Sequence, residues 1–401
     1  MLLLLALAAG LNASAPDPLT LAQAVAHART ASPLRAASER LVEGSTEAER
    51  LAGRMLNPLI DVRVENLGRQ PSLQRDVFAV VGQPLELGGK RQLRVGIAAA
   101  DRALAVANLH NTDALISLRT SQLYVQTLRA RGVFDARTAD REALGTLIAT
   151  LRQRVAEGHT AESDLLKFET EAARMDIEIA RARLDVERSV NTLSYVIGAA
   201  VPLSATQLVE PANVTPPPVD PSAIAAAIAR HPDLAAASAR VERARQMAAL
   251  ERARRIPDPV ISGGYKRTNG FDSAVVGVAV SVPIFEHNGS AAAKAAGEAG
   301  ALAAERGALA ARLAADATTL VITAEALAQR SARAADELLA PADAVRNAAL
   351  VSFSEGRSDV LRLLDAQRVY ADVRRTILEL RLDAIAAALE ARFALGEEMM
   401  P

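Results

Sequence analysis

The chain has 401 residues, and its 46 Lys and Arg nearly balance its 47 Asp and Glu, giving a formal net charge of −1 at pH 7. This balance provides no strong electrostatic field and gives no support for nucleic-acid binding. Half of the residues are hydrophobic, but only 3% are aromatic, and cysteine and tryptophan are absent. Disulfides, thiol catalysis and thiolate metal sites are therefore excluded.

The first 15 residues are interpreted as a signal peptide. Met1 to Leu11 is almost wholly apolar, and Ala13-Ser14-Ala15 gives the small-residue cleavage pattern before Pro16. The usual basic n-region is missing, so a short buried N-terminal helix is the alternative. No later stretch approaches the roughly 18 to 20 continuous apolar residues of a membrane-spanning helix. Any membrane crossing is therefore expected to consist of strands.

A Pro-rich linker at 202–221 divides the chain into two structural repeats, at 16–201 and 222–401. Short elements of the first repeat recur 198 or 199 residues later: Ser32-Pro33 as His231-Pro232, Gln83-Pro84 as Val282-Pro283, and Glu157-Gly158 as Glu355-Gly356. Each match alone is weak. The nearly constant offset over the whole length predicts an internal duplication.

Each repeat is expected to contain a helix, two strands, a very long helix, a tight turn and a further helix. The strands are predicted at about 59–66, 75–87, 260–267 and 273–285. The helices that follow them are predicted at 89–155 and 160–197 in the first repeat, and at 288–353 and 357–395 in the second. The first long helix would measure about 100 Å. Pro341 should kink the corresponding long helix of the second repeat, at 288–353.

The strands alternate between apolar and small or charged residues. Ile60, Val62 and Val64 alternate with Asp61, Arg63 and Glu65, and Val276, Val278, Val280, Val282 and Ile284 alternate with Gly277, Ala279 and Ser281. An ordinary sheet with one face on a soluble core is an equal alternative on the strands alone. If the sheet lies in lipid, four strands cannot close a barrel, and open edges would leave backbone groups unpaired. Several chains would then share one barrel.

Over essentially its whole mature length, the chain resembles the TolC family of outer-membrane channels. The resemblance rests on the duplication, the SP/HPDL element that opens each repeat, the strand pairs that end in Gln83-Pro84 or Val282-Pro283, and the turns VAEGHTAESDLL (155–166) and FSEGRSDVLRLLDAQ (353–367). The segment PLELGGKRQLR (84–94) is similar to the cobalt-zinc-cadmium branch, which works with heavy-metal pumps of the RND type.

This resemblance implies a mainly α fold with β structure. Four strands per protomer would contribute to a trimeric, 12-stranded outer-membrane β-barrel, continued by a long α-helical barrel through the periplasm of a Gram-negative cell. It implies a homotrimer that contacts outer-membrane lipid, a periplasmic adaptor (membrane fusion) protein and an inner-membrane RND-type pump. The pump supplies the energy, so the duct would be no enzyme and would need no cofactor. The expected function is the exit duct of a tripartite efflux system for heavy-metal cations.

The same resemblance assigns roles to residues of the two turns. Gly158, His159, Thr160, Gly356, Arg357 and Ser358 would dock the adaptor, and Asp164, Asp365, Arg357 and Arg362 would form the gate or a lumen ring. A solvated helix face is the alternative for the aspartates. The chain departs from the family pattern at Ser358, where a latching arginine is sometimes found, and at Arg362, where a second acidic ring is sometimes found.

Two further expectations concern glycines and histidines. Gly88 and Gly89 should turn strand into helix, with Lys90 and Arg91 at the periplasmic side of the membrane. The five histidines are scattered and never occur at the i, i+4 spacing of a helical metal site, so no metal site is predicted.

Two other functions remain open. One is an exit duct for drugs or secreted protein, and the other is a periplasmic coiled-coil structural protein with a small soluble sheet.

Overall fold

The computed structural model describes residues 18–67, 75–199, 203–211, 214–355 and 357–397. The predicted signal peptide lies outside these residues. The chain divides into two compact units, both built from several segments. Unit 1 comprises Met1–Arg35, Asp113–Ile228 and Leu313–Pro401, and unit 2 comprises Ala36–Thr112 and Ala229–Arg312.

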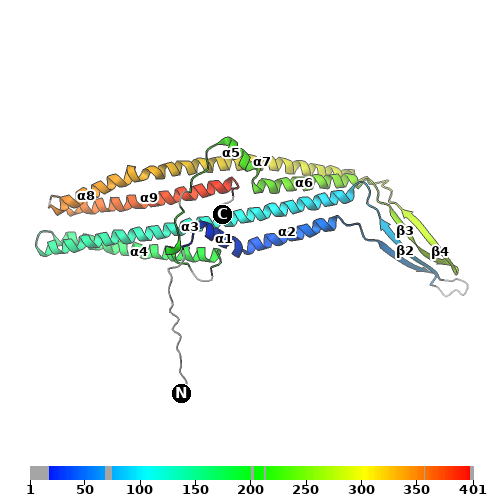
Figure 1. The fold of residues 1–401 in the computed structure, drawn as a ribbon, viewed down its shortest axis with the longest axis horizontal. Helices are drawn as coiled ribbons and strands as arrows, with labels where there is room; N and C mark the ends of the chain where they lie inside the picture. Colours follow the sequence, from blue (N-terminus) through cyan, green and yellow to red (C-terminus); the bar gives the residue numbers. More distant parts are fainter. Residues whose placement is uncertain (1–17, 68–74, 200–202, 212–213, 356, 398–401) are drawn as a thin grey trace, which may run out of the picture. The chain divides into compact units, whose positions relative to one another are not determined.

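Unit 1 is helical (Figure 1). It contains α1 (Leu21–Ala31), α4 (Glu162–Val196), the short 3₁₀ helix η1 (Ala205–Gln207), α5 (Pro221–Ala229), the π-helical turn η2 (Ala335–Leu339), α8 (Ala340–Ser354) and α9 (Val360–Ala394). Two long helices, α3 (Lys90–Ala156) and α7 (Gly289–Ala334), contribute their C-terminal parts to unit 1 and their N-terminal parts to unit 2. Unit 2 adds α2 (Pro33–Ala52), α6 (Pro232–Ala253) and a four-stranded sheet.

The helices α4 and α9 are structural counterparts. Each has 35 residues, and each is followed by a glycine with positive φ, Gly198 at 67° and Gly396 at 66°. In both, the glycine N–H and the next N–H bond back to carbonyls of the last turn, which is the Schellman motif. The carbonyl groups at both helix ends are thereby satisfied without a side-chain cap.

The core of unit 1 surrounds Tyr124, which is fully buried. Its hydroxyl lies 2.6 Å from the carbonyl oxygens of Leu19 and Val209 and accepts the Val209 N–H at 2.9 Å. Residues of α1, α3, α4 and α9 pack together around this point, and so does the buried Leu208. The stretch predicted as a linker is therefore fixed to the core by this tyrosine.

The second long helix runs through Pro341 without a break. The π-helical turn η2 ends two residues before this proline, and α8 continues directly from it. A proline removes one helical hydrogen bond and crowds the preceding turn, and a π turn provides room for both effects. Within Gly289–Ser354, an 18-residue window is long and apolar enough to cross a membrane by length and composition, but only 17% of it is buried.

The sheet is antiparallel, with strand order β1-β2-β3-β4. Its strands are β1 (Leu59–Glu65), β2 (Asp76–Pro84), β3 (Val260–Thr268) and β4 (Phe271–Ala279). The central β2–β3 pair joins the two repeats, and both edge strands lack a partner within the described sheet. The expected fold, mainly helical with four strands, is thus confirmed.

Three strand boundaries differ by two residues or more from those expected. β4 begins at Phe271, because Asn269 and Gly270, with φ of 49° and 82°, form a two-residue turn directly after β3. β4 ends at Ala279 although the alternation continues to Ile284, because its partner β3 begins only at Val260. Pro259 precedes that residue and has no N–H to donate. β2 likewise ends at Pro84 instead of Leu87.

The register separates a mainly apolar face of the sheet from a mixed one. Opposite residues share a face, so the mainly apolar face carries the polar residues Gln83, Arg267 and Asp272 beside Ile60, Val62, Val64, Val77, Ala79, Val81, Ile261, Tyr265, Ala274, Val276 and Val278. On this face, the side chains of Ile60 and Val276 are 75% and 82% exposed. The other face carries the polar Asp61, Arg63, Ser262 and Lys266 together with the apolar Leu59, Phe78, Val80, Val260, Phe271 and Val275. On that face a Cβ at Gly264 would lie 2.1 Å from the Ala79 carbonyl oxygen, so only glycine fits there.

Candidate functional site

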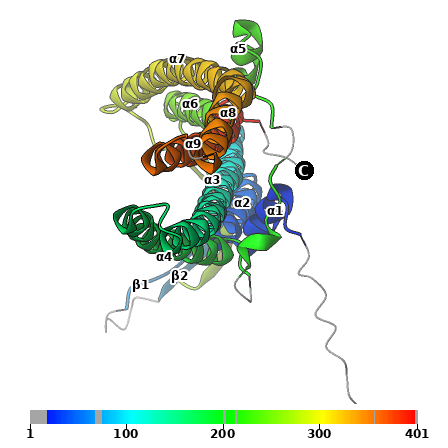
Figure 2. The same ribbon diagram turned by 90° about the vertical axis from the view of Figure 1, so that its left-hand side faces the viewer.

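Two helical hairpins, α3–α4 and α8–α9, end side by side in unit 1 (Figure 2). One apolar cluster joins them: Leu144, Ile148 and Leu151 of α3, Phe168 and Ala172 of α4, Phe353 of α8, and Val360, Leu363 and Leu364 of α9. Leu151, Phe168 and Leu363 are fully buried. The two turns beyond this cluster, which we name the tip turns, therefore rest on a common core.

The first tip turn reverses the chain at Gly158, whose φ is 75°. Its N–H bonds to the Val155 carbonyl at 3.0 Å, and the His159 N–H bonds to the Arg154 carbonyl at 2.9 Å. This is again a Schellman motif, and it needs a residue that tolerates the left-handed conformation. Nothing lies within 4 Å of a Cβ placed on Gly158, and His159 is exposed. Thr160 is half-buried.

The second tip turn is described except at Gly356, which lies outside the described residues. The Arg357 N–H donates to the Ser352 carbonyl at 2.9 Å, and the Arg357 guanidinium pairs with Glu355. Ser358 is half-buried. Asp359 caps α9 by accepting the Leu361 N–H at 3.3 Å.

Arg154 connects the two tips. Its guanidinium lies 4.7 Å from the centre of the Phe353 ring and donates to the carbonyl oxygens of Phe353 and Ser354 at 3.2 and 3.3 Å. These carbonyls end α8, where a positive charge is favourable. The residue 198 positions later is Ser352, which cannot form the reciprocal contact. The two tips are thus linked by a contact that only the first repeat supplies.

The four predicted gate residues do not form one cluster within the chain. Asp164, in the first turn of α4, pairs with Lys167 at 3.0 Å, and Arg357 pairs with Glu355. Asp365 and Arg362 are exposed on α9, and neither makes an ion pair within the described part of the chain. Within the described residues, Asp164 is thus paired with a lysine of its own helix and with no arginine.

The structure adds a charged cluster that the sequence did not indicate. Glu171 of α4 is only 5% exposed, and its carboxylate accepts hydrogen bonds from Arg174 at 2.7 Å and Arg368 of α9 at 2.6 Å. The bond from Arg174, followed by that from Arg368, lowers the pKa of Glu171 although burial opposes this. The contact with Arg368 ties the first hairpin to the second.

A second ion pair supports the same junction. Asp140 of α3 accepts a hydrogen bond from Arg374 of α9 at 3.1 Å. Burial raises the pKa of Asp140, because desolvation outweighs the attraction of Arg374 and Arg375. A pocket of about 390 Å³ lies beside these groups, and its charged lining residues are largely paired with one another.

The strand-to-helix residues lie in unit 2. Gly88 and Gly89 have φ of 69° and 72°, and a Cβ at Gly88 would lie 2.8 Å from a methyl carbon of Ile256. Lys90, the first residue of α3, is buried, and its ammonium lies 2.8 Å from the carboxylate of Asp258. Lys90 therefore holds the two repeats together at this point, whereas Arg91 is exposed.

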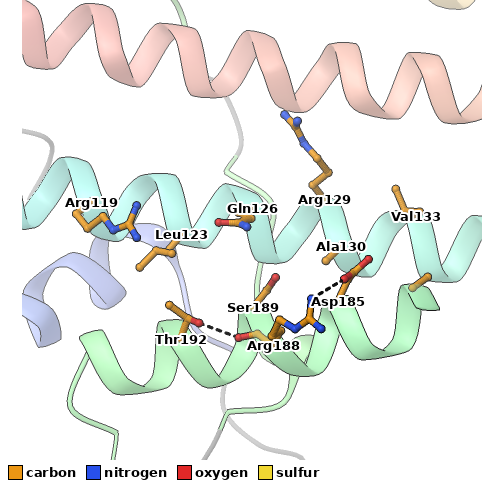
Figure 3. A pocket seen from close by; sticks show the side chains of 11 residues that line it. Arg119, Leu123, Gln126, Arg129, Ala130, Val133, Asp185, Arg188, Ser189 and Thr192 are labelled. Carbon is orange, nitrogen blue, oxygen red and sulfur yellow. Dashed lines mark hydrogen bonds and ion pairs between the residues drawn. The ribbon is translucent and has the colours of Figure 1, made fainter. Parts of the chain in front are cut away.

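A groove of about 510 Å³ runs between α3 and α4 (Figure 3). Asp185 and Arg188 of α4 pair across one rim at 3.6 Å, and Arg129 of α3 extends toward α9, where it pairs with Asp383. Of the charged groups that line the groove, Asp185 and Arg188 thus pair with each other, and Arg129 pairs with a residue outside the lining. Among the described residues, no group of three His, Cys, Asp or Glu side chains could hold a metal ion.

Comparison with known proteins identifies the second repeat most directly. Residues 223–397 match the family described as "Outer membrane efflux protein". The cobalt-zinc-cadmium resistance protein CzcC of Cupriavidus metallidurans is 29% identical over 366 residues, which cover 90% of this chain and 86% of CzcC. The nickel and cobalt resistance protein CnrC of the same organism is 29% identical over 238 residues, covering 58% of this chain and 56% of CnrC.

Solved structures show the same fold. The outer-membrane channel OprN has a TM-score of 0.79 at 16% identity, covering 95% of this chain and 91% of OprN. The outer membrane protein VceC of Vibrio cholerae has a TM-score of 0.78 at 18% identity, covering 94% and 96%. The expected resemblance is thereby confirmed: residues 223–397 match the outer membrane efflux protein family, and nearly the whole chain is similar in fold to these outer-membrane channels.

Proposed function

We propose that this chain is one protomer of a trimeric exit duct in the outer membrane, which works with a periplasmic adaptor and an inner-membrane RND-type pump to export heavy-metal cations. The observation that carries the proposal is the sheet. It has an exposed, mainly apolar face, a second face that mixes polar and apolar residues, and two edge strands without a partner within the described sheet. In lipid such edges must be paired, and three copies of a four-stranded sheet provide a closed 12-stranded barrel.

The mixed face of the sheet, with Asp61, Arg63 and Lys266, would then line the lumen, and the mainly apolar face would contact lipid. This arrangement disfavours a soluble coiled-coil protein, because the apolar face has no cover within the described part of unit 2 and would remain in contact with water. The two repeats, 16–201 and 222–401, each contribute two strands. The duct is passive and is no enzyme, since the pump supplies the energy.

Heavy-metal cations are proposed as cargo because the relatives CzcC and CnrC are named for resistance to cobalt, zinc, cadmium and nickel. Selection among these ions is proposed to be the task of the pump. The tip turns, with Gly158, His159, Thr160, Gly356, Arg357 and Ser358, are proposed to dock the adaptor. Asp164, Asp365, Arg357 and Arg362 are proposed to act between protomers as a gate or lumen ring.

The test measures the metal tolerance of cells and the oligomeric state of the protein in outer membranes. Cells that lack the chain should lose tolerance to Co²⁺, Zn²⁺ and Cd²⁺ and regain it on complementation, and chemical cross-linking of outer membranes should give a trimer. A monodisperse soluble monomer would overturn the duct. Unchanged metal tolerance together with increased sensitivity to drugs would keep the duct and overturn the cargo.

A further inference from the structure

The segments that connect the sheet to the helices of unit 2 lie together at one end of the sheet (Figure 1). We call them the four junctions, and in chain order they are 53–58, 85–89, 254–259 and 280–288. The second junction leads into α3, whose Arg94 donates to the Arg54 carbonyl of the first at 3.2 Å. The buried Lys90 joins the second junction to the third. Asn288 of the fourth donates to the Glu251 carbonyl, near the end of α6, at 2.6 Å. The junctions therefore form one continuous surface.

The acidic side chains at the junctions are largely paired with basic ones. The pairs are Glu86 with Arg94, Asp258 with Lys90, and Glu251 with Arg254. All three carboxylates are buried or half-buried, at 11%, 31% and 13% side-chain exposure. Glu286 is exposed and makes no ion pair among the described residues. Most of the negative charge at the junctions is therefore already neutralised.

An excess of positive charge remains. Four arginines of this surface are exposed and make no ion pair within the part of the chain that the structure describes: Arg54, Arg91, Arg252 and Arg255. A guanidinium nitrogen of Arg255 lies 3.7 Å from the position of a Cβ on Gly289, the first residue of α7. Arg91 lies in the first turn of α3, and the first turns of α3 and α7 contain no acidic residue. Because a helix N-terminus favours negative charge, both helix ends and the arginines beside them favour a bound anion.

Exposed apolar side chains adjoin the arginines on the side of the sheet. Met55 directly follows Arg54 and is 60% exposed, and Ile256 directly follows Arg255. Phe285, in the fourth junction, is 98% exposed. The other exposed apolar side chains of the junctions are Leu56, Leu87, Val280, Val282 and Ile284. From the helices toward the strands, the surface thus changes from cationic to apolar.

We propose that the junction surface binds anionic phospholipids of the periplasmic leaflet, with the lipid phosphate on the four arginines and the acyl chains on the neighbouring apolar side chains. The order of the two layers matches a bilayer, in which headgroups lie outside the hydrocarbon. Arginine suits this partner, because its guanidinium binds phosphate oxygens through two parallel hydrogen bonds. The inference rests on the proposed duct, whose sheet would lie in the outer membrane, and it identifies the lipid class that the duct would prefer.

Native mass spectrometry of the full-length protein, extracted from outer membranes in detergent, counts the lipids that remain bound. Dioleoylphosphatidylglycerol and dioleoylphosphatidylcholine share their acyl chains, and only the first has a net negative charge. The wild type should bind phosphatidylglycerol more tightly, by about fivefold for each arginine that contacts the headgroup. The test variant combines Arg54→Gln, Arg91→Gln, Arg252→Gln and Arg255→Gln and should lose this preference. The matched control makes the same change at exposed helical arginines without an ion pair among the described residues: Arg40, Arg181, Arg240 and Arg245.

The outcomes separate the lipid surface from the duct itself. If a wild-type trimer binds both lipids equally, or if the control loses as much preference as the junction variant, the lipid surface is overturned and the duct stands. If the junction variant does not assemble, the wild type decides at rising ammonium acetate concentration. Its preference should weaken, because salt screens exposed charges, and a preference that salt leaves unchanged would contradict the role of the arginines. If the wild type is a soluble monomer, the inference and the proposed function both fail.

Discussion

Replacing Arg368 by alanine should loosen the junction between the two hairpins, and with it the proposed gate. Arg368 lies on α9 and donates two hydrogen bonds to Glu171 of α4, at 2.6 and 3.4 Å. The substitution leaves the buried carboxylate with Arg174 alone, and Arg174 is on the same helix as Glu171. The ionic link between α4 and α9 is thereby lost, while the apolar tip core stays intact.

The size of the effect follows from the burial of the two partners. A hydrogen bond to a charged group contributes about 1.5 to 3 kcal/mol, and exposed ion pairs contribute about 0.2 to 1 kcal/mol. The Glu171 side chain is 6% exposed and that of Arg368 is 51% exposed, so we expect an intermediate value of about 1 kcal/mol per chain. Three chains would then shift the closed-to-open equilibrium by about 3 kcal/mol, roughly a hundredfold.

Planar-bilayer recording of the purified channel measures this shift directly, as the fraction of time in the open state. The control is Arg183→Ala, which removes an exposed arginine whose partner, Glu187, lies on the same helix. Thermal unfolding checks that both variants remain folded. If Arg368→Ala opens no more often than Arg183→Ala, the Glu171 contact does not hold the hairpins together, and the assigned role is wrong.

Three further predictions concern the tip and the core. Asp365→Ala should lower cation over anion selectivity in bilayers, because a ring of three carboxylates is removed, and unchanged reversal potentials would place Asp365 on a solvated helix face. Gly158→Val should reduce efflux at normal trimer levels, since a β-branched residue is strained at φ of 75°, whereas Glu157→Val should have little effect. Burial raises the pKa of Tyr124 to about 12, above the 10.0 of an unfolded tyrosine. The neutral Tyr124 hydroxyl therefore adds about 2.7 kcal/mol to the free energy of unfolding below pH 10, and this contribution is lost as the pH rises through 12. Tyr124→Phe should remove that part of the alkaline loss of stability, and identical pH profiles would contradict it.

The fold could be predicted where local chemistry determines it. Alternation at Ile60, Val62 and Val64 indicated a strand with two unlike faces, because side chains in a strand alternate by geometry alone. The end of β4 could not be predicted in this way, because it depends on the partner strand. The alternation of Val280 and Val282 continues, but Pro259 ends the ladder on β3.

The charged junction was missed for a related reason. Glu171 and Arg368 are far apart in sequence, and each follows the pattern of a charge on a solvated helix face. Only the packing of α4 near α9 shows that Glu171 is buried. Lys90 is a similar case. The sequence placed it at the periplasmic side of the membrane but did not indicate that its ammonium is buried against Asp258, a residue of the other repeat.

The pairing of β2 with β3 has a consequence for biosynthesis. Val77 pairs with Arg267 and Pro84 with Val260, so the central ladder joins segments separated by roughly half of the chain. The β1–β2 hairpin emerges from the ribosome and from export well before its partner, and its valines and isoleucine then have neither lipid nor sheet to cover them. Contacts this distant in sequence form slowly, and uncovered strand edges aggregate. The first hairpin is therefore the segment for which a periplasmic chaperone would matter most during transit.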